Sequence, residues 1–142
     1  MPTSLPAYMP FIGLFLYGCT SVSSVQVLEV IDGDTIITTV GTVRLIGIDA
    51  PEKEECGYQE ATDKLIKLAE GKDVMLVADY LNDDRDKYGR LLRYVETDDG
   101  DVGEVLLKEH YVDLYPWFPA ERLEQYRLIL KKAPGGRLVG CS

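Results

Sequence analysis

The chain has 142 residues, of which 46% are hydrophobic and 27% are charged, and this suits one compact domain and excludes a low-complexity or disordered chain. Its net charge of −9 at pH 7 excludes the broad basic surface of proteins that bind nucleic acid through many phosphate contacts. An acidic chain can still bind phosphates where a few Arg and Lys side chains converge and a metal ion sits among carboxylates.

The chain begins with an apolar run, Met9 to Tyr17, and has no charged residue before Glu29. The run is too short to span a bilayer, which takes about 20 residues, and has the length of a signal-peptide hydrophobic region. Leu16-Tyr17-Gly18-Cys19 then resembles a bacterial lipobox, in which Cys19 becomes a lipidated N-terminus attached to a membrane. We therefore predict a leader and linker over residues 1–24, a folded domain over residues 25–142, and export to the cell surface or beyond. An apolar extension or a misplaced start codon is the alternative.

Two further cysteines, Cys56 and Cys141, lie in the folded domain. A disulfide between them would tie down the C-terminal end in an oxidising compartment. Two unpaired thiols are the alternative.

In chain order, β-branched and apolar residues predict five strands, and apolar residues at helical spacing predict three helices. The strands are expected at Val25–Ile31, Thr35–Val40, Val43–Ile48, Val74–Val77 and Leu91–Val95. The helices are expected at about residues 58–70, 101–110 and 120–132, the second of which includes His110 and opens on an Asp101/Glu104 capping box. Five short strands with a helix after the third predict an α+β protein that is mainly a five-stranded closed barrel of the OB type with three attached helices.

Three polar motifs interrupt these elements: Asp32-Gly33-Asp34-Thr35, Arg44 to Glu52 and Asp86-Lys87-Tyr88-Gly89-Arg90. Carboxylate and carbonyl oxygens are the ligands that a hard cation such as Ca²⁺ prefers, and Asp34 and Asp49 can supply two carboxylates. Arginines can bind phosphate oxygens as negative charge gathers on them, and Arg44 and Arg90 are candidates. Glu52 can activate or orient a water molecule. The motifs together predict metal-assisted attack on a phosphodiester.

Each motif alone has an ordinary structural explanation. Asp-Gly-Asp is common in turns, Arg44 can pair with a carboxylate, and Lys87 to Arg90 can enter a hairpin. An EF-hand starting at Asp84 fails because Val95 stands where the loop needs Glu. His110 is the single histidine, which leaves little for a zinc site or a Ser-His-Asp triad.

Taken together and in this order, Asp-Gly-Asp-Thr, Arg-Leu-x-Gly-Ile-Asp-Ala-Pro-Glu and Asp-Lys-Tyr-Gly-Arg resemble the signature of the staphylococcal nuclease family. The resemblance covers about residue 25 to the C-terminus. It implies a five-stranded OB barrel with three helices. It also implies a monomeric Ca²⁺-dependent endonuclease that hydrolyses DNA and RNA, preferably single-stranded or frayed, and leaves 3′-phosphate ends.

The resemblance also implies a role for each residue that matches a motif. Asp34, Asp49 and the backbone carbonyl of Ala50 would bind Ca²⁺, with Asp32 close to the metal. Arg44 and Arg90 would bind the scissile phosphate, and Glu52 would be the general base or orient the water. Lys87 and Tyr88 would contact a terminal phosphate or base of the substrate.

Two segments depart from the family pattern. Lys53 to Gly57 is shorter and more acidic than the basic loop common in the family, which bears on substrate affinity. Tyr115 to Phe118 lies where family members place base-stacking tyrosines, but its register is open, and it can equally be apolar cover for the barrel.

Two rival functions remain: an inactive module that binds nucleic acid or a protein partner, and an acidic lipoprotein that stores or senses calcium. The first would normally lose part of the catalytic set, whereas Asp34, Arg44, Asp49, Glu52 and Arg90 are all present. The second leaves both arginines unexplained.

Overall fold

The computed structural model describes residue 13, residues 24–133 and residues 135–142, so Cys19 lies outside the described residues. The strands are β1 (Val25–Asp32), β2 (Thr35–Thr38), β3 (Gly41–Leu45), β4 (Ile48–Asp49), β5 (Asp73–Val77), β6 (Leu91–Thr97), β7 (Gly100–Asp101) and β8 (Asp113–Leu114). The helices are α1 (Tyr58–Ala69), α2 (Val102–Lys108) and α3 (Leu123–Lys132).

Five of the strands close into a barrel. Antiparallel pairs join β3 to β2, β2 to β1, β1 to β5 and β5 to β6. A parallel pair between β3 and β6 then joins the two ends of this series. The predicted mixed α+β fold, a five-stranded OB-type barrel with three helices, is confirmed.

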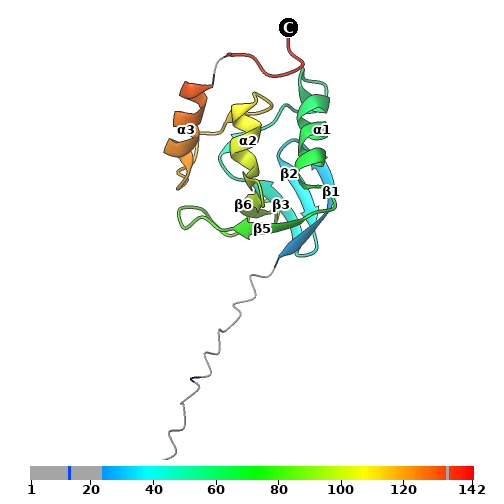
Figure 1. The fold of residues 1–142 in the computed structure, drawn as a ribbon, viewed down its shortest axis with the longest axis vertical. Coiled ribbons are helices and arrows are strands. Elements are labelled where there is room, and N and C mark those ends of the chain that lie inside the picture. Colours follow the sequence, from blue (N-terminus) through cyan, green and yellow to red (C-terminus); the bar gives the residue numbers. More distant parts are fainter. Residues whose placement is uncertain (1–12, 14–23, 134) are drawn as a thin grey trace, which may run out of the picture.

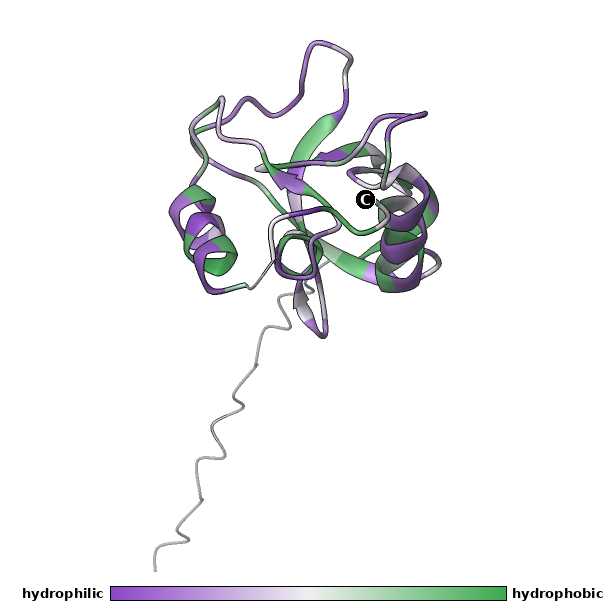
Figure 2. Cartoon of the chain, turned by 90° about the horizontal axis from the view of Figure 1, so that it is seen from above, coloured by the Kyte–Doolittle hydropathy of each residue, from purple (hydrophilic) through white to green (hydrophobic). Residues whose placement is uncertain are grey.

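The hydrophobic core fills the barrel and continues under the helices. Strand residues with no more than 2% exposure include Val27, Ile36, Val43, Leu45, Val74, Tyr94 and Val95. Helix α1 adds Ala61, Leu65 and Ala69, which are fully buried on one face, while its other face is polar. Figure 2 shows the same mixture of hydrophilic and hydrophobic residues along the helices.

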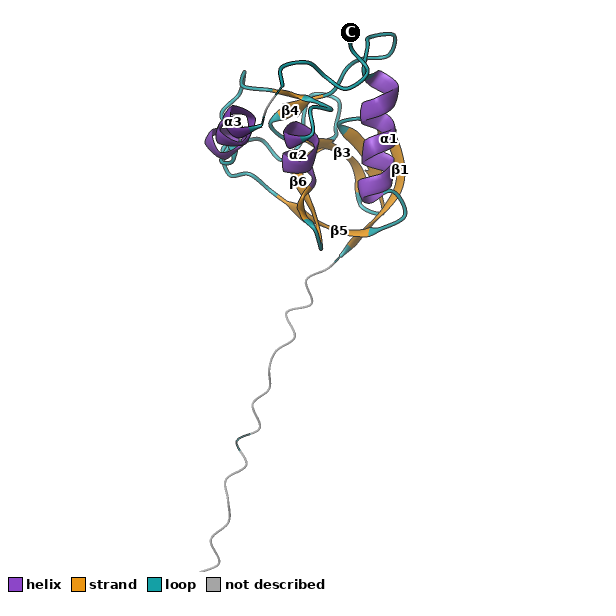
Figure 3. Ribbon diagram, turned by 45° about the horizontal axis from the view of Figure 1, so that its top comes forward, coloured by secondary structure: helices purple, strands orange, loops and turns teal. Residues whose placement is uncertain are grey.

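The three helices stand side by side, with α2 between α1 and α3 (Figures 1 and 3). Asp101 caps α2, as predicted, by accepting hydrogen bonds from the Gly103 and Glu104 backbone N–H groups. Its second oxygen accepts hydrogen bonds from the Arg122 guanidinium and the Tyr126 hydroxyl. One buried carboxylate therefore begins α2 and attaches α3 to it.

The structure corrects three predicted boundaries. Strand β2 ends at Thr38, because the chain turns before Gly41, whose φ is +128°. The predicted strand over residues 43–48 is broken at Gly47, whose φ is +79°, so that Ile48 pairs with a different strand, β8. His110 lies after α2 rather than within it, with a φ of +60°. Strand β2 ends because residues 39–40 form the turn into β3. The differences at Gly47 and His110 follow from a positive φ, which the middle of a regular strand or helix rarely accommodates.

Cys56 and Cys141 form a disulfide that joins residues 85 apart in sequence. Within the described residues, no helix has the length and apolar character needed to cross a membrane.

The buried carboxylate of Asp79 joins three segments at one end of the barrel. Its oxygens accept hydrogen bonds from the Leu81 backbone N–H, the Tyr94 hydroxyl and the Glu121 backbone N–H. Burial alone would raise the pKa of Asp79, but these hydrogen bonds outweigh burial and lower it. The loop after β5, strand β6 and the segment before α3 are thus held by one charged group.

Replacing Asp79 with asparagine should lower the free energy of unfolding by about 1–3 kcal/mol at neutral pH, because the new amide turns N–H groups toward existing donors. The lowered pKa means that the ionised carboxylate stabilises the fold above its unfolded-state pKa and loses this contribution as the pH falls through its folded-state pKa. Urea unfolding should therefore show a difference between wild type and Asp79→Asn that shrinks from about pH 7 to about pH 3. Asp98→Asn, in an exposed turn, is the control. A difference that widens in acid would contradict this role.

Candidate active site

The turn between β1 and β2 places two aspartates beside the first helix. Gly33 has no space for a side chain, because a Cβ there would lie 2.7 Å from the Ala61 Cβ and 2.8 Å from the Ala50 Cβ. This close approach seats the turn against α1 and directs Asp34 into the protein, where it is 5% exposed. Asp32 accepts a hydrogen bond from the Asp34 backbone N–H at 3.1 Å. The Asp-Gly-Asp motif is therefore a turn whose packing fixes its second carboxylate.

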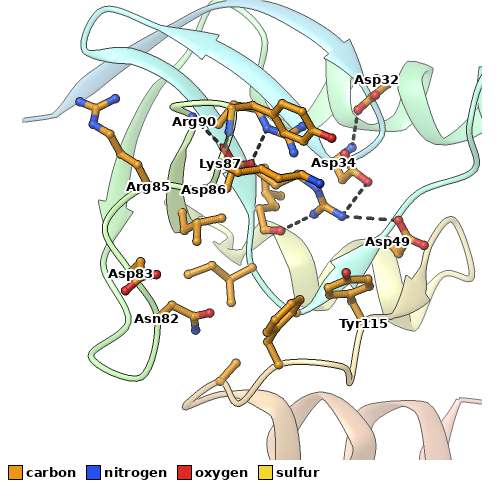
Figure 4. Close-up of a pocket in the computed structure, with 18 of the residues that line it drawn as sticks. Asp32, Asp34, Asp49, Asn82, Asp83, Arg85, Asp86, Lys87, Arg90 and Tyr115 are labelled. Carbon is orange, nitrogen blue, oxygen red and sulfur yellow. Dashed lines mark hydrogen bonds and ion pairs between the residues drawn. The ribbon is translucent and has the colours of Figure 1, made fainter.

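Arg44, on strand β3, lies between the carboxylates of Asp34 and Asp49. Its Nη2 is 3.2 Å from Asp34 Oδ2 and 3.4 Å from Asp49 Oδ1. Its Nη1 donates hydrogen bonds to the carbonyl oxygens of Leu45 and Ile48. The guanidinium is thus held on both sides, and Arg44, predicted to bind the scissile phosphate, lies beside Asp34 and Asp49, the two predicted carboxylate ligands of Ca²⁺. Figure 4 shows the two aspartates facing the same space.

Arg90 reaches the same place through the parallel pairing that closes the barrel. Residue Leu91 of β6 pairs with Val43 of β3, and Leu92 pairs with Arg44, so Arg90 lies only two residues along the strand direction from the position opposite Arg44. The Arg90 Nε donates to Asp86 Oδ2 at 2.7 Å, and the Arg90 backbone N–H donates to Asp86 Oδ1 at 3.0 Å. Asp86 therefore orients Arg90, a role that the sequence prediction left unassigned although Asp86 opens the motif.

One pocket is lined by nearly all of the predicted residues (Figure 4). Its acidic residues are Asp32, Asp34, Asp49, Glu52, Asp83 and Asp86, and its basic residues are Arg44, Arg85, Lys87 and Arg90. Six carboxylates face four cations, which leaves an excess of two negative charges when all are ionised. Basic side chains do converge in this pocket, as expected for a phosphate-binding site on an acidic chain. They do not outnumber the acidic side chains there.

Burial first, and then neighbouring negative charge, raise the pKa values of two of these carboxylates. Burial and repulsion by the neighbouring Asp34 carboxylate raise the pKa of Asp32 to about 6. Burial also raises the pKa of Asp49, although the Arg44 guanidinium acts in the opposite direction. A cation placed among these carboxylates would relieve both effects.

The donor set around Asp34 and Asp49 consists of oxygen atoms, which fits a hard cation. Ala50 is buried and donates its backbone N–H to Asp34 Oδ2 at 2.9 Å, and this bond orients the carboxylate. Its carbonyl as a metal ligand stays a prediction. Within the described residues, no group of three or more His, Cys, Asp or Glu side chains is arranged to hold a metal ion. A cation here would therefore complete its shell with carbonyl or water oxygens.

The structure shows which residues of the aromatic segment after β8 face the pocket, a point that the sequence alone left open. The Tyr115 ring centre lies 5.8 Å from the Arg44 Cζ, and the Tyr115 backbone N–H donates to the Gly47 carbonyl oxygen. Tyr115 and Phe118 line the pocket, with ring centres 6.1 Å apart. Trp117 is 77% exposed and is not among the lining residues. The resemblance placed this segment where base-stacking tyrosines are expected and left its register open; the β4–β8 pairing brings Tyr115 beside Arg44.

The predicted substrate contacts lie on the outer wall of the pocket. Tyr88 is 71% exposed, with the Lys87 Nζ 5.0 Å and the Arg90 Cζ 5.2 Å from its ring centre. An exposed ring flanked by two cations can stack on a base while the cations face phosphates.

Replacing Asp86 with alanine should lower kcat for phosphodiester cleavage about 10–100-fold, because Arg90 loses the partner that orients it and a displacement of about 1 Å has effects of that size. Ca²⁺ affinity should change little, since Asp86 lies outside the predicted ligand set. Steady-state kinetics and calcium titration of Asp86→Ala test this, with Asp98→Ala as a control of equal charge at the far end of β6. Equal losses in both variants would show that net charge, not Arg90 orientation, is responsible.

Comparison with known proteins identifies several relatives. The family described as "Staphylococcal nuclease homologue" matches residues 42–137. An "Uncharacterized endonuclease" of Escherichia coli is 36% identical over 101 residues, which are 66% of this chain and 62% of the relative. "Endonuclease YncB" of Bacillus subtilis (strain 168) is 34% identical over 120 residues, which are 76% of this chain and 56% of the relative. "SPbeta prophage-derived endonuclease YokF" of the same strain is 40% identical over 89 residues, with 56% of this chain and 30% of the relative covered. The chain thus spans less than two thirds of the length of these curated relatives.

Proposed function

The chain belongs to the staphylococcal nuclease family, and on that premise we propose that it is a Ca²⁺-dependent endonuclease that hydrolyses phosphodiester bonds of DNA and RNA and leaves 3′-phosphate ends. The observation that carries the proposal is the position of Arg44 between Asp34 and Asp49, in one pocket with Glu52 and Arg90. This arrangement combines oxygen ligands for a cation, two guanidinium groups for a phosphate and a carboxylate for a water molecule. The names of the relatives, all endonucleases, support the same class of reaction.

Asp34, Asp49 and the Ala50 carbonyl would hold the calcium ion, with Asp32 nearby. When bound there, Ca²⁺ supplies positive charge that stabilises the phosphoryl oxygens and helps to place a water molecule. The excess of two negative charges in the pocket supports a divalent cation at this place, because an anionic substrate would otherwise enter a repulsive field.

The protein's own residues then bind and orient the reactants. Arg44 and Arg90 donate hydrogen bonds to the nonbridging oxygens of the scissile phosphate, most strongly as those oxygens gain charge. Glu52 accepts a proton from the attacking water, or orients that water, as the water oxygen bonds to phosphorus. The bond between phosphorus and the 5′ oxygen breaks, and the departing oxygen takes up a proton from solvent, which leaves a 3′-phosphate and a 5′-hydroxyl. Lys87 and Tyr88 hold a neighbouring phosphate or base, which fixes the strand relative to Glu52.

The exposed rings at the pocket support a preference for single-stranded or frayed substrate. Tyr88 and Phe118 are 71% and 61% exposed, and a base can stack on such a ring only when it is not paired within a duplex.

Incubation of the full-length chain with denatured DNA and with RNA, in millimolar Ca²⁺ and again in a chelator, tests the proposed function. We expect internal cleavage of both polymers in Ca²⁺ only, with products that carry 3′-phosphate ends. Cutting that persists in the chelator would overturn the calcium dependence. Binding of nucleic acid and Ca²⁺ without any cutting would make the chain a nucleic-acid-binding module instead.

We further propose that the protein is exported and acts as a monomer. The Cys56–Cys141 disulfide supports an oxidising compartment, where such bonds persist. A monomer is supported by the pocket, to which this one chain contributes all the proposed catalytic residues. Mass spectrometry of the mature N-terminus distinguishes a lipidated Cys19 from simple cleavage and from an unprocessed chain.

A further inference from the structure

The C-terminal segment, residues 135–142, returns from the side of α3 across the molecule to the start of α1 (Figure 1). There Cys141 is bonded to Cys56, in the loop that carries Glu52. We propose that the Cys56–Cys141 disulfide positions Glu52 for the reaction, so that this pair acts on turnover as well as on stability. The inference rests on the proposed function, in which Glu52 activates or orients the attacking water.

The loop, the C-terminal segment and the disulfide meet at Gly57. A Cβ on Gly57 would lie 3.0 Å from the Val139 carbonyl oxygen, 3.3 Å from the Pro51 Cγ and 3.6 Å from the Cys141 Sγ. Gly57 also has a φ of +84°, which favours glycine. Pro51 directly precedes Glu52 in sequence. The disulfide therefore lies near Pro51, the residue directly before Glu52.

The hydrogen bonds of Glu52 itself are local to its loop. Residues 50–57 lie between β4 and α1, in neither a strand nor a helix. The Glu55 backbone N–H donates to the Glu52 carbonyl oxygen at 2.9 Å, and the Glu52 backbone N–H donates to Glu55 Oε1 at 2.9 Å. These two bonds shape the turn, but they join exposed residues of the same turn to each other. They cannot fix the turn relative to Arg44.

The C-terminal segment is anchored to the domain at two other places. The Val139 backbone N–H donates to the His110 carbonyl oxygen at 2.8 Å. Gly140 packs so closely on the Glu60 carboxylate, in the first turn of α1, that a Cβ there would overlap it. Because Cys141 follows these contacts directly, the disulfide joins the Glu52 loop to a fixed part of the molecule. The packing of Pro51 restrains the start of the loop, and the disulfide at Cys56 restrains its end.

Loss of the disulfide should therefore displace Glu52 and leave the rest of the pocket intact. Arg44 lies on β3, Asp34 in the β1–β2 turn, and Asp86 and Arg90 in the segment before β6, so the barrel's own pairing supports them. Asp49 lies on β4 and is held by the pairing of β4 with β8. We expect kcat to fall about 10–100-fold. The KM for the polymer and the Kd for Ca²⁺ should stay within about twofold, because neither depends on the position of Glu52.

The test uses the full-length chain with Cys19→Ser, which leaves Cys56 and Cys141 as its only cysteines. Steady-state kinetics compare this parent with the variant that also carries Cys56→Ser and Cys141→Ser. Treatment of the folded parent with a dithiol provides a second route that does not require the variant to fold. The dithiol donates two electrons and two protons to the disulfide, giving two thiols, and is itself oxidised to a disulfide. The serine variant treated with the same dithiol is the control and should not change.

A double-mutant cycle with Glu52→Gln separates positioning from general destabilisation. If the disulfide acts through Glu52, its removal in the Glu52→Gln background should cause no further fall in kcat. An equal fall in both backgrounds, at a temperature where circular dichroism shows each protein folded, would overturn the inference. So would an unchanged kcat in the reduced parent. A parent that cuts nothing when oxidised would instead refute the proposed function.

Discussion

Arg44→Ala should lower kcat for phosphodiester cleavage about 10²–10³-fold, the effect of losing one charged contact to a transition state. Affinity for Ca²⁺ should be retained or increased, because the Arg44 guanidinium now lies within 3.4 Å of both carboxylates proposed to bind the ion. Removing a positive charge from that place makes the field more favourable for a cation. The opposite signs of these effects distinguish Arg44 from a residue that merely supports the metal site.

Kinetics and calcium titration of three variants provide the measurement. Arg85→Ala is the matched control: it removes the same charge from the same pocket, but the Arg85 side chain is 53% exposed and points away from the carboxylates (Figure 4). It should have a much smaller effect on kcat than Arg44→Ala. Arg44→Lys keeps the positive charge but loses the paired N–H donors of the guanidinium, so its kcat should lie between those of wild type and Arg44→Ala. Loss of Ca²⁺ binding in folded Arg44→Ala would show that Arg44 is structural.

Glu52→Gln should lower kcat about 10²–10⁴-fold, the range expected for removing a general base. The substitution keeps the size of the side chain, and the backbone bonds between Glu52 and Glu55 do not involve the Glu52 carboxylate. Loop shape, substrate KM and Ca²⁺ affinity should therefore be preserved. Steady-state kinetics at saturating Ca²⁺ measure the effect.

Glu54→Gln is the control for this second substitution. Glu54 is an exposed residue of the same loop and does not line the pocket, so its replacement removes the same charge at a short distance from the proposed reaction. It should leave kcat nearly unchanged. Equal losses in Glu52→Gln and Glu54→Gln would mean that the charge of the loop matters and that Glu52 has no individual role.

The regular elements were predictable because their signals are local. β-Branched runs marked the strands of the barrel, and a one-faced apolar pattern marked α1. The Asp101 cap was visible as a spacing of three residues to Glu104. The break at Gly47 was not predicted, because the apolar residues on both sides of this glycine continue the strand pattern. The ring of Tyr126 packs there and would lie 3.1 Å from a Cβ at Gly47. That contact joins residues far apart in sequence.

The candidate site, like the fold, was predictable only in part. Its residue types were predictable, since oxygen ligands, guanidinium groups and a carboxylate base stood in three short motifs. The partners of these groups were not: Asp86 as the support of Arg90 and Tyr115 beside Arg44 each depend on the path of the chain. A Cys56–Cys141 disulfide was one of two possibilities that the sequence offered, and its role at the Glu52 loop was not indicated. The net charge of the sequence indicated weak attraction for nucleic acid, but only the pocket shows acids exceeding bases where the substrate would bind.

By itself, the sequence determined the family, the barrel with three helices and the set of groups available for chemistry, because these depend on composition, periodicity and motif order. The tertiary structure alone decided which groups meet. Arg44 and Arg90 are brought close together by the parallel pairing of β3 with β6, and the loop that carries Glu52 is joined through Cys56 to Cys141, which is 85 residues away in sequence. Such contacts form between segments distant along the chain, where closure of the barrel and burial of a shared core set the distances, and no local pattern of residues specifies them.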